Sequence, residues 1–246
     1  MLFFPLFAAV ALQASPASSP PEDVISQAAR QPPRQARTAL AQAGGKIRQD
    51  DARGLARLSR AWSDTVAEHP DPSDASARQA AQQALDLAEA AVRADPRSAQ
   101  ARLALAIACG KETDFVDSRT KVALARRIRA ESERAIALDP QLALAYHVLG
   151  RWHLGMAEVG PFARLGARFT VGQLPPASMQ EAVRNLAKAA ELSPRTIAFH
   201  QYLAIASQAA GQRNEALRQW RIVRDLPAES REDEEAQRQA RAALGR

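Results

Sequence analysis

The stretch LDPQLALAYHVLGRWHLG, residues 138–155, decides the fold of this chain. One helical segment ends at Pro140 and a second begins directly after it, because proline can neither continue a helix nor donate a hydrogen bond to it. Tyr146, Gly150 and His153 then follow at spacings of three and four, which places them on one face of the second helix. The stretch therefore predicts two consecutive helices, with a small residue where a neighbouring helix approaches closely.

The same arrangement recurs along the chain. Amphipathic segments that stop at a proline also occur at AEAAVRADP (88–96), LAKAAELSP (186–194) and RQWRIVRDLP (218–227). Helical stretches follow the first two of these prolines as well. Units of helix, turn, helix and proline at periods of 20–50 residues are typical of repeat architectures. The sequence predicts an all-α, right-handed α-solenoid of helix pairs.

The repeats are unequal in length. Pro194 and Pro227 are 33 residues apart, but Pro96 and Pro140 are 44 apart, and Pro140 and Pro194 are 54 apart. We therefore expect two insertions, which the sequence places around residues 111–120 and at residues 156–178.

Segments outside the repeats also read as helices. Residues 22–43 and 50–71 have helical patterns, and Asp50 is expected near the N-cap of the second. The polar tail from Pro227 is predicted to form a helix that covers the last apolar face of the array.

The helix pairs resemble the tetratricopeptide repeat, with Tyr146, Leu149, Gly150 and His153 at the four first-helix positions. The segments LDPQLALAYHVLGRWH, LPPASMQEAVRNLAKAAELSP and AAGQRNEA more specifically resemble the regulator of microtubule dynamics family over residues 95–245. The resemblance implies a tetratricopeptide-like helical domain. Microtubule binding is implied by this resemblance alone.

Composition and charge restrict the partners. The chain has a formal charge of +6, but its arginines alternate with acidic residues, as in RRIRAESERA (126–135). Mixed signs indicate a solvated helix surface rather than a nucleic-acid footprint. We expect no nucleic-acid partner.

The N-terminus resembles an export signal. An apolar run of about eleven residues precedes small residues, which suits a signal-peptide core and is too short for a membrane span. We expect a signal peptide at 1–17, a Pro/Ser-rich spacer at 18–24, a helical repeat domain at 25–246 and a periplasmic location. Retention of the segment as an uncleaved anchor is the alternative.

Four polar residues are candidate contacts for a ligand in the concave groove of the array. His147 and Arg151 are one helical turn apart, so they share a face, and Lys111 and Gln201 are expected beside them. The leading hypothesis is that this groove binds a peptide or a partner helix. His153 and Trp152 are instead expected to pack between helices.

The second insertion carries two further candidates. Phe162, Leu165 and Phe169 are three and four residues apart and would form one apolar helix face, flanked by Arg164 and Arg168. This face is expected either to pack over the neighbouring repeat as a lid or to cover an apolar groove. In the second case the arginines would meet an anionic head group or carboxylate, and the chain would carry a lipid or fatty acyl ligand.

The residues give no support for catalysis or for a bound metal or cofactor. His147 and His153 are six apart and lie on different helix faces, so they do not match the one-turn spacing of paired metal ligands. Cys109 lies in an apolar stripe and reads as a buried small side chain. We expect a non-enzymatic interaction module of the cell envelope, with no metal and no cofactor.

Overall fold

The computed structural model describes residues 25, 33–45, 47–66 and 70–245. The regular elements of these residues are all helical, and they form two compact units that divide between Asp139 and Pro140. The N-terminal unit contains α2 (Pro33–Gly44), α3 (Ala52–Asp64), α4 (Ala75–Ala94), α5 (Ala99–Glu112), the short 3₁₀ helix η1 (Thr113–Phe115) and α6 (Ser118–Leu138). The C-terminal unit contains α7 (Ala143–Ala157), α8 (Pro161–Thr170), α9 (Met179–Leu192), α10 (Ile197–Ala209), α11 (Arg213–Asp225) and α12 (Arg231–Leu244).

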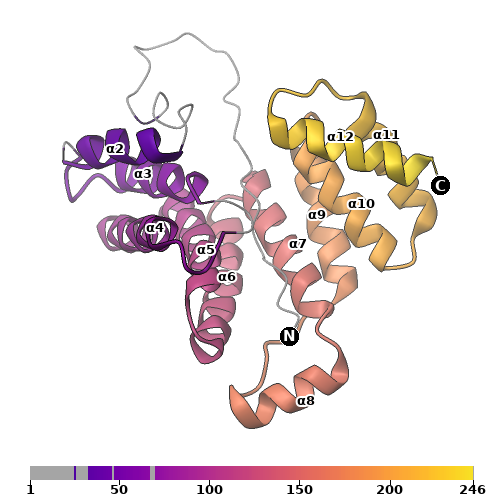
Figure 1. Ribbon diagram of the computed structural model, residues 1–246, viewed down its shortest axis with the longest axis horizontal. Coiled ribbons are helices and arrows are strands. Elements are labelled where there is room, and N and C mark those ends of the chain that lie inside the picture. Colours follow the sequence, from indigo (N-terminus) through magenta and orange to yellow (C-terminus); the bar gives the residue numbers. More distant parts are fainter. Residues whose placement is uncertain (1–24, 26–32, 46, 67–69, 246) are drawn as a thin grey trace. The chain divides into compact units, whose positions relative to one another are not determined.

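Within each unit, helices that follow one another in sequence pack side by side (Figure 1). In the N-terminal unit α3 packs on α4, α4 on α5 and α5 on α6. In the C-terminal unit α7 packs on α9, and α9, α10, α11 and α12 follow in order, whereas α8 branches off between α7 and α9. The predicted all-α array of helix pairs is confirmed.

Small residues set the distance between the paired helices. Gly150 faces Leu186, and a Cβ at position 150 would lie 2.6 Å from Leu186 Cγ and 3.0 Å from the Leu186 backbone nitrogen. In the N-terminal unit, buried alanines line one side of α4, namely Ala77, Ala80, Ala81, Ala84, Ala88 and Ala91. The close approach predicted at Gly150 is therefore present, between α7 and α9.

Side chains that follow the repeat prolines hold the turns. Arg102, six residues after Pro96, donates through Nε and Nη2 to the Pro96 carbonyl and through Nη1 to Glu131 of α6 at 2.9 Å. His200, six residues after Pro194, contacts the Pro194 carbonyl at 2.9 Å and Gln219 at 2.6 Å. At these two turns, the residue six positions after the proline thus links the turn to the second helix of its pair. Sequence periodicity alone did not reveal this role.

Hydroxyl and carboxylate caps define the helix starts. The Asp51 side chain accepts a hydrogen bond from the Gly54 amide at the start of α3. Asp50, expected near this cap, directly precedes it and forms an exposed ion pair with Arg48. Ser230 caps α12, and Ala236 and Ala240 of α12 are buried in a cluster with Ile197 and Trp220. The predicted terminal cap helix is confirmed.

The single cysteine lies inside the N-terminal unit. Cys109 is fully buried on α5, and its desolvation raises the pKa of the thiol to about 12. Because the thiolate is the reactive form, Cys109 is inert at neutral pH and serves as an apolar side chain.

Candidate functional site

His147 and Arg151 lie against α10 and are buried. His147 is 1% exposed, and its ring stacks at 4.8 Å on Phe199 and meets Tyr202 edge-on at 5.2 Å. The Arg151 guanidinium lies 4.0 Å from the centre of the Tyr202 ring, in cation–π geometry. Both candidate ligand contacts are therefore buried, because aromatic side chains of α10 contact them.

Burial also sets the charge of His147. Desolvation, and secondarily the Arg151 guanidinium, lower the pKa of His147 well below its usual 6.5. The imidazole is therefore neutral at pH 7, and neither ring nitrogen has a hydrogen-bond partner. A neutral, enclosed imidazole has no charge to offer a ligand.

Lys111 and Gln201 have different surroundings. Lys111 belongs to the N-terminal unit, is 2% exposed and donates through Nζ to the Val66 carbonyl at 2.6 Å, beyond the end of α3. Its ammonium thus joins α5 to the chain that follows α3, so this candidate contact is buried in the N-terminal unit. Gln201 is partly exposed on α10 and donates to Gln239 of α12 at 3.0 Å. It remains a candidate contact for a partner.

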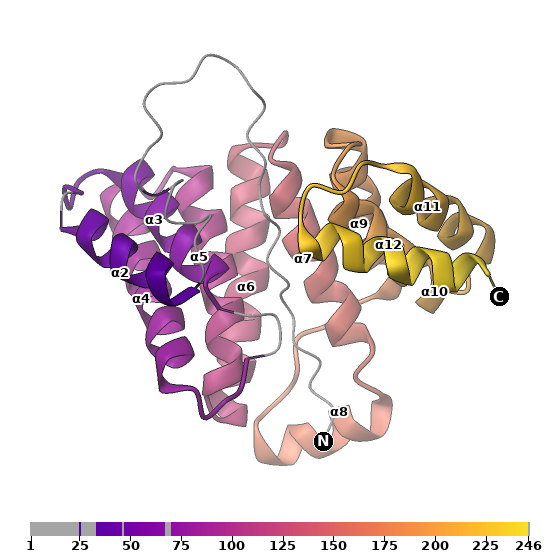
Figure 2. The same cartoon turned by 45° about the horizontal axis from the view of Figure 1, so that its top comes forward.

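The helix α8 exposes its apolar face. Phe162 is 89% exposed, Leu165 56% and Phe169 82%. Both figures show α8 displaced from α11 and α12, at the far end of α7 (Figures 1 and 2). The amphipathic helix predicted here is confirmed, but the expectation that its apolar face is covered is wrong.

Arg164 holds α8 in place. Its guanidinium donates to the carbonyls of Val159 at 3.1 Å and Pro175 at 3.3 Å, and also to that of Met156. These three acceptors lie on either side of α8 in sequence, so the arginine closes the base of the insertion. Arg168, one turn later, is exposed. Of the two arginines, only Arg168 is therefore placed for an external anion.

This arrangement predicts the effect of Arg164→Met. Removal of three hydrogen bonds to main-chain carbonyls should loosen α8 without unfolding the repeats, because none of residues 162–170 is buried in the core. In hydrogen–deuterium exchange, we expect the amides of residues 161–170 to exchange about ten-fold faster. Arg168→Met, the exposed control, should leave the exchange rates unchanged. Equal exchange rates in both variants would show that the hydrogen bonds of Arg164 do not hold α8 in place.

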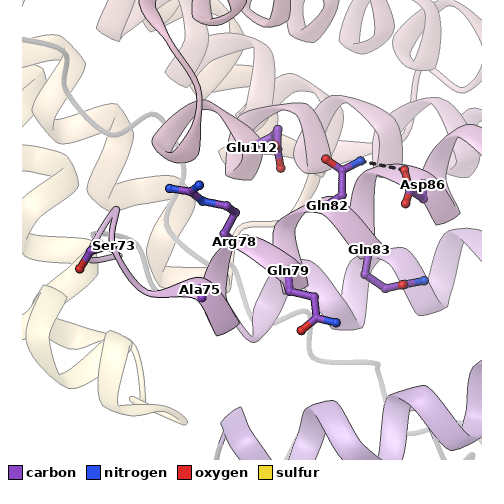
Figure 3. A pocket seen from close by; sticks show the side chains of 8 residues that line it. All are labelled: Ser73, Ala75, Arg78, Gln79, Gln82, Gln83, Asp86 and Glu112. Carbon is purple, nitrogen blue, oxygen red and sulfur yellow. Dashed lines mark hydrogen bonds between the residues drawn. The ribbon is translucent and has the colours of Figure 1, made fainter.

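A cleft lined mostly by residues of polar type, which the sequence did not predict, lies on the N-terminal unit. It has a volume of about 450 Å³ and is formed by the first half of α4 and the end of α5 (Figure 3). Glu112 points from α5 toward the space between Arg78 and Gln82 of α4. The other lining residues are Ser73, Ala75, Gln79, Gln83 and Asp86. A single carboxylate at a helix end gave no signal in the sequence.

The described residues contain neither a cluster of metal ligands nor a helix that could cross a membrane. Across residues 25, 33–45, 47–66 and 70–245, no three His, Cys, Asp or Glu side chains lie together as metal ligands would. Over the same ranges, no helix combines the length and hydropathy needed to cross a bilayer.

The sequence is similar to one described family over almost its whole length. The model described as "Regulator of microtubule dynamics protein 1-3" matches residues 24–246. Regulator of microtubule dynamics protein 3 of Xenopus laevis is 28% identical over 185 residues, which are 74% of this chain and 39% of that protein. Regulator of microtubule dynamics protein 1 of Mus musculus is 28% identical over 79% of this chain and 64% of its own length. The chain thus spans less than two thirds of these relatives.

The fold is also that of a solved tetratricopeptide-repeat protein. The crystal structure of TTC0263, a thermophilic TPR protein of Thermus thermophilus, aligns with a TM-score of 0.62 at 16% identity. The alignment covers 87% of this chain and 91% of that one. At this identity the similarity establishes the architecture, an α-solenoid of tetratricopeptide-like helix pairs, and nothing about ligands.

Proposed function

The chain belongs to the regulator of microtubule dynamics family, and we propose that it is a non-enzymatic protein-interaction module whose partner covers the apolar face of α8. The observation that carries the proposal is the exposure of Phe162, Leu165 and Phe169 on one side of this helix. Contiguous exposed apolar side chains are uncommon on monomeric proteins and mark interaction surfaces.

The chemistry of α8 indicates the kind of partner. Anchors three and four residues apart match the spacing at which one amphipathic helix packs against another. Arg168 is exposed beside them, and no acidic residue occurs between Glu158 and Glu181. We therefore expect a partner helix with an apolar stripe and acidic flanking residues, which would be attracted to this basic, apolar surface.

The concave groove expected from the sequence is the other proposed surface for a peptide or partner helix. Gln201 is partly exposed there, but His147 and Arg151 are buried. Binding in this groove stays a proposal, and α8 is the better surface to test first.

Photo-crosslinking tests the α8 surface. A photoreactive phenylalanine analogue at position 162 should capture a partner in cells, and the same analogue at position 138 should not. Leu138, which is 40% exposed on α6, is a matched apolar control site. The captured partner is then titrated against the purified chain and the double variant Phe162→Ser/Phe169→Ser.

We expect the double variant to bind this partner at least about 30-fold more weakly, because central aromatic anchors dominate interface energies. Its stability should change by no more than about 0.5 kcal/mol, because both side chains are exposed. Unchanged affinity, or equal crosslinking from position 138, would exclude α8 as the binding surface.

A second candidate function is that of a carrier for a lipid or fatty acyl chain. It is favoured by the same apolar face together with exposed Arg168, which suits an anionic head group. Native mass spectrometry after gentle purification distinguishes the candidates. A co-purifying lipid that is lost in Phe162→Ser/Phe169→Ser supports the carrier, and a ligand-free mass with an intact protein partner supports the interaction module.

Location and microtubule binding are separate proposals. The predicted signal peptide at 1–17 and spacer at 18–24 lie outside the described residues, so the periplasmic location and the domain boundary at residue 25 remain sequence predictions. Cell fractionation tests the location.

The names of the relatives refer to microtubule dynamics, and co-sedimentation with polymerised tubulin would show whether this chain shares that property.

A further inference from the structure

The cleft on α4 contains a carboxylate that the fold leaves unsatisfied. Glu112 is 7% exposed, and its Oε2 atom is inaccessible to water and has no hydrogen-bond partner. Buried carboxylate oxygens are normally paired or hydrogen-bonded, because leaving one without a partner opposes folding. An orphaned acceptor at the wall of a cleft marks a candidate binding site.

The local charge of this cleft is opposite to that of the chain. Glu112 and Asp86 contribute two carboxylates, against one guanidinium from Arg78, in a protein with a formal charge of +6. Arg78 does not neutralise the orphaned oxygen, because Glu112 Oε2 has no hydrogen-bond partner and the Arg78 guanidinium donates to the Pro72 carbonyl at 3.0 Å. Burial is the main cause that raises the pKa of Glu112, and Asp86 adds to it, while Arg78 acts in the opposite direction. The cleft therefore has more acidic than basic groups, and a second cation would complement its charge.

The remaining lining suits a peptide. Gln79, Gln82 and Gln83 present exposed amides along α4, and Gln82 donates to Asp86 at 2.8 Å (Figure 3). Primary amides both donate and accept hydrogen bonds, so they can pair with a peptide backbone of any sequence. The volume of about 450 Å³ lies within the range of about 300–1,000 Å³ that is typical of ligand sites.

We infer that this cleft binds an arginine or lysine side chain of a partner protein. The cationic head would contact Asp86 and the Glu112 carboxylate, which turns by side-chain rotation to present its buried oxygen, and the flanking backbone would pair with the glutamine amides. The assignment goes beyond the proposed role of α8 and does not depend on it, because it rests on residues of the other unit. If binding at α8 is disproved, the proposal for the cleft still holds, and the reverse is also true.

The test uses a short peptide as its probe. Ac-Gly-Ala-Arg-Ala-Gly-NH₂ is titrated into the ¹⁵N-labelled full chain while the side-chain amide signals of Gln79, Gln82 and Gln83 are followed by NMR. The comparison peptide carries citrulline, which has the shape of arginine without its charge. Free agmatine is a third probe, because it supplies the guanidinium without a peptide backbone.

We expect saturable shifts with the arginine peptide, weaker shifts with agmatine and none with the citrulline peptide. Glu112→Gln should weaken binding of the arginine peptide at least about ten-fold, because the buried charge partner is lost. Glu133→Gln, on an exposed residue of α6 that pairs with Arg129, is the matched control and should bind normally.

A second variant protects the test against misfolding. If Glu112→Gln alters the helical circular dichroism signal, Asp86→Asn replaces it, since Asp86 is exposed and its loss should weaken binding about three-fold. The inference is overturned by equal shifts from the citrulline peptide, by full affinity in both cleft variants, or by the absence of saturable shifts with the arginine peptide. Binding of agmatine as tight as that of the peptide would assign the cleft to a free organic cation instead.

Discussion

Gly150→Val is expected to lower the free energy of unfolding of the C-terminal unit by about 3 kcal/mol, the upper range for overpacked cores. Even the first added carbon would lie 2.6 Å from Leu186 Cγ and 3.0 Å from the Leu186 backbone nitrogen. The backbone of α9 cannot yield as a side-chain tip can, so α7 and α9 must separate. Urea denaturation monitored by circular dichroism measures the effect as a lower midpoint.

Gly166→Val is the matched control for this prediction. Gly166 lies in a helix of the same unit, and a Cβ at position 166 meets no atom within 4 Å. The control should therefore change stability by no more than about 0.5 kcal/mol. If Gly150→Val were as stable as Gly166→Val, the close approach of α7 and α9 would be wrong.

His147→Leu is expected to stabilise the protein by about 1–3 kcal/mol at pH 8, the usual penalty for a buried polar group left unsatisfied. His147 is 1% exposed, and neither ring nitrogen has a hydrogen-bond partner. Leucine keeps the apolar contact with Phe199 and Tyr202 and removes the orphaned nitrogens. Thermal or urea denaturation of both proteins measures the difference.

The advantage of His147→Leu should grow as the pH falls. Burial lowers the pKa of His147 well below 6.5 in the folded protein, so the unfolded chain binds a proton that the folded chain excludes. Stability linked to this group is complete above about pH 6.5 and is lost progressively below it. Denaturation curves from pH 8 to pH 5 should therefore diverge between wild type and variant.

His200→Leu gives the opposite sign and serves as the control. Both nitrogens of His200 are engaged, one with Gln219 at 2.6 Å and one with the Pro194 carbonyl at 2.9 Å. Its replacement leaves these partners unsatisfied and should destabilise the protein by about 1–3 kcal/mol. Stabilisation by both substitutions would mean that hydrogen bonding does not distinguish the two histidines.

The repeat pattern predicted the helix pairs well because its signals are local. Proline at 96, 140 and 194 ends a helix through its own ring and missing N–H, wherever the rest of the chain lies. The helix that carries Phe162, Leu165 and Phe169 was likewise expected from the spacing of these residues. Such signals need only the geometry of one turn.

The candidate site was predicted less well. His147 and Arg151 were correctly placed on one helix face, but whether that face meets solvent or Phe199 and Tyr202 depends on a helix some 50 residues away in the chain, as the residue numbers show. The cleft at Glu112 was missed for the same reason, because its walls come from two helices. Burial is a property of contacts between elements, and no local pattern contains it.

The sequence by itself determined that helices end before Pro96, Pro140 and Pro194, which residues share a face, and where Gly150 permits close packing. Those outcomes follow from backbone geometry and from the conformational limits of proline and glycine. Only the tertiary structure decided that His147 and Lys111 are buried, that the apolar face of α8 is exposed, and that Glu112 Oε2 lacks a partner. Desolvation and pairing depend on which helix lies opposite, and that is settled when the helices assemble.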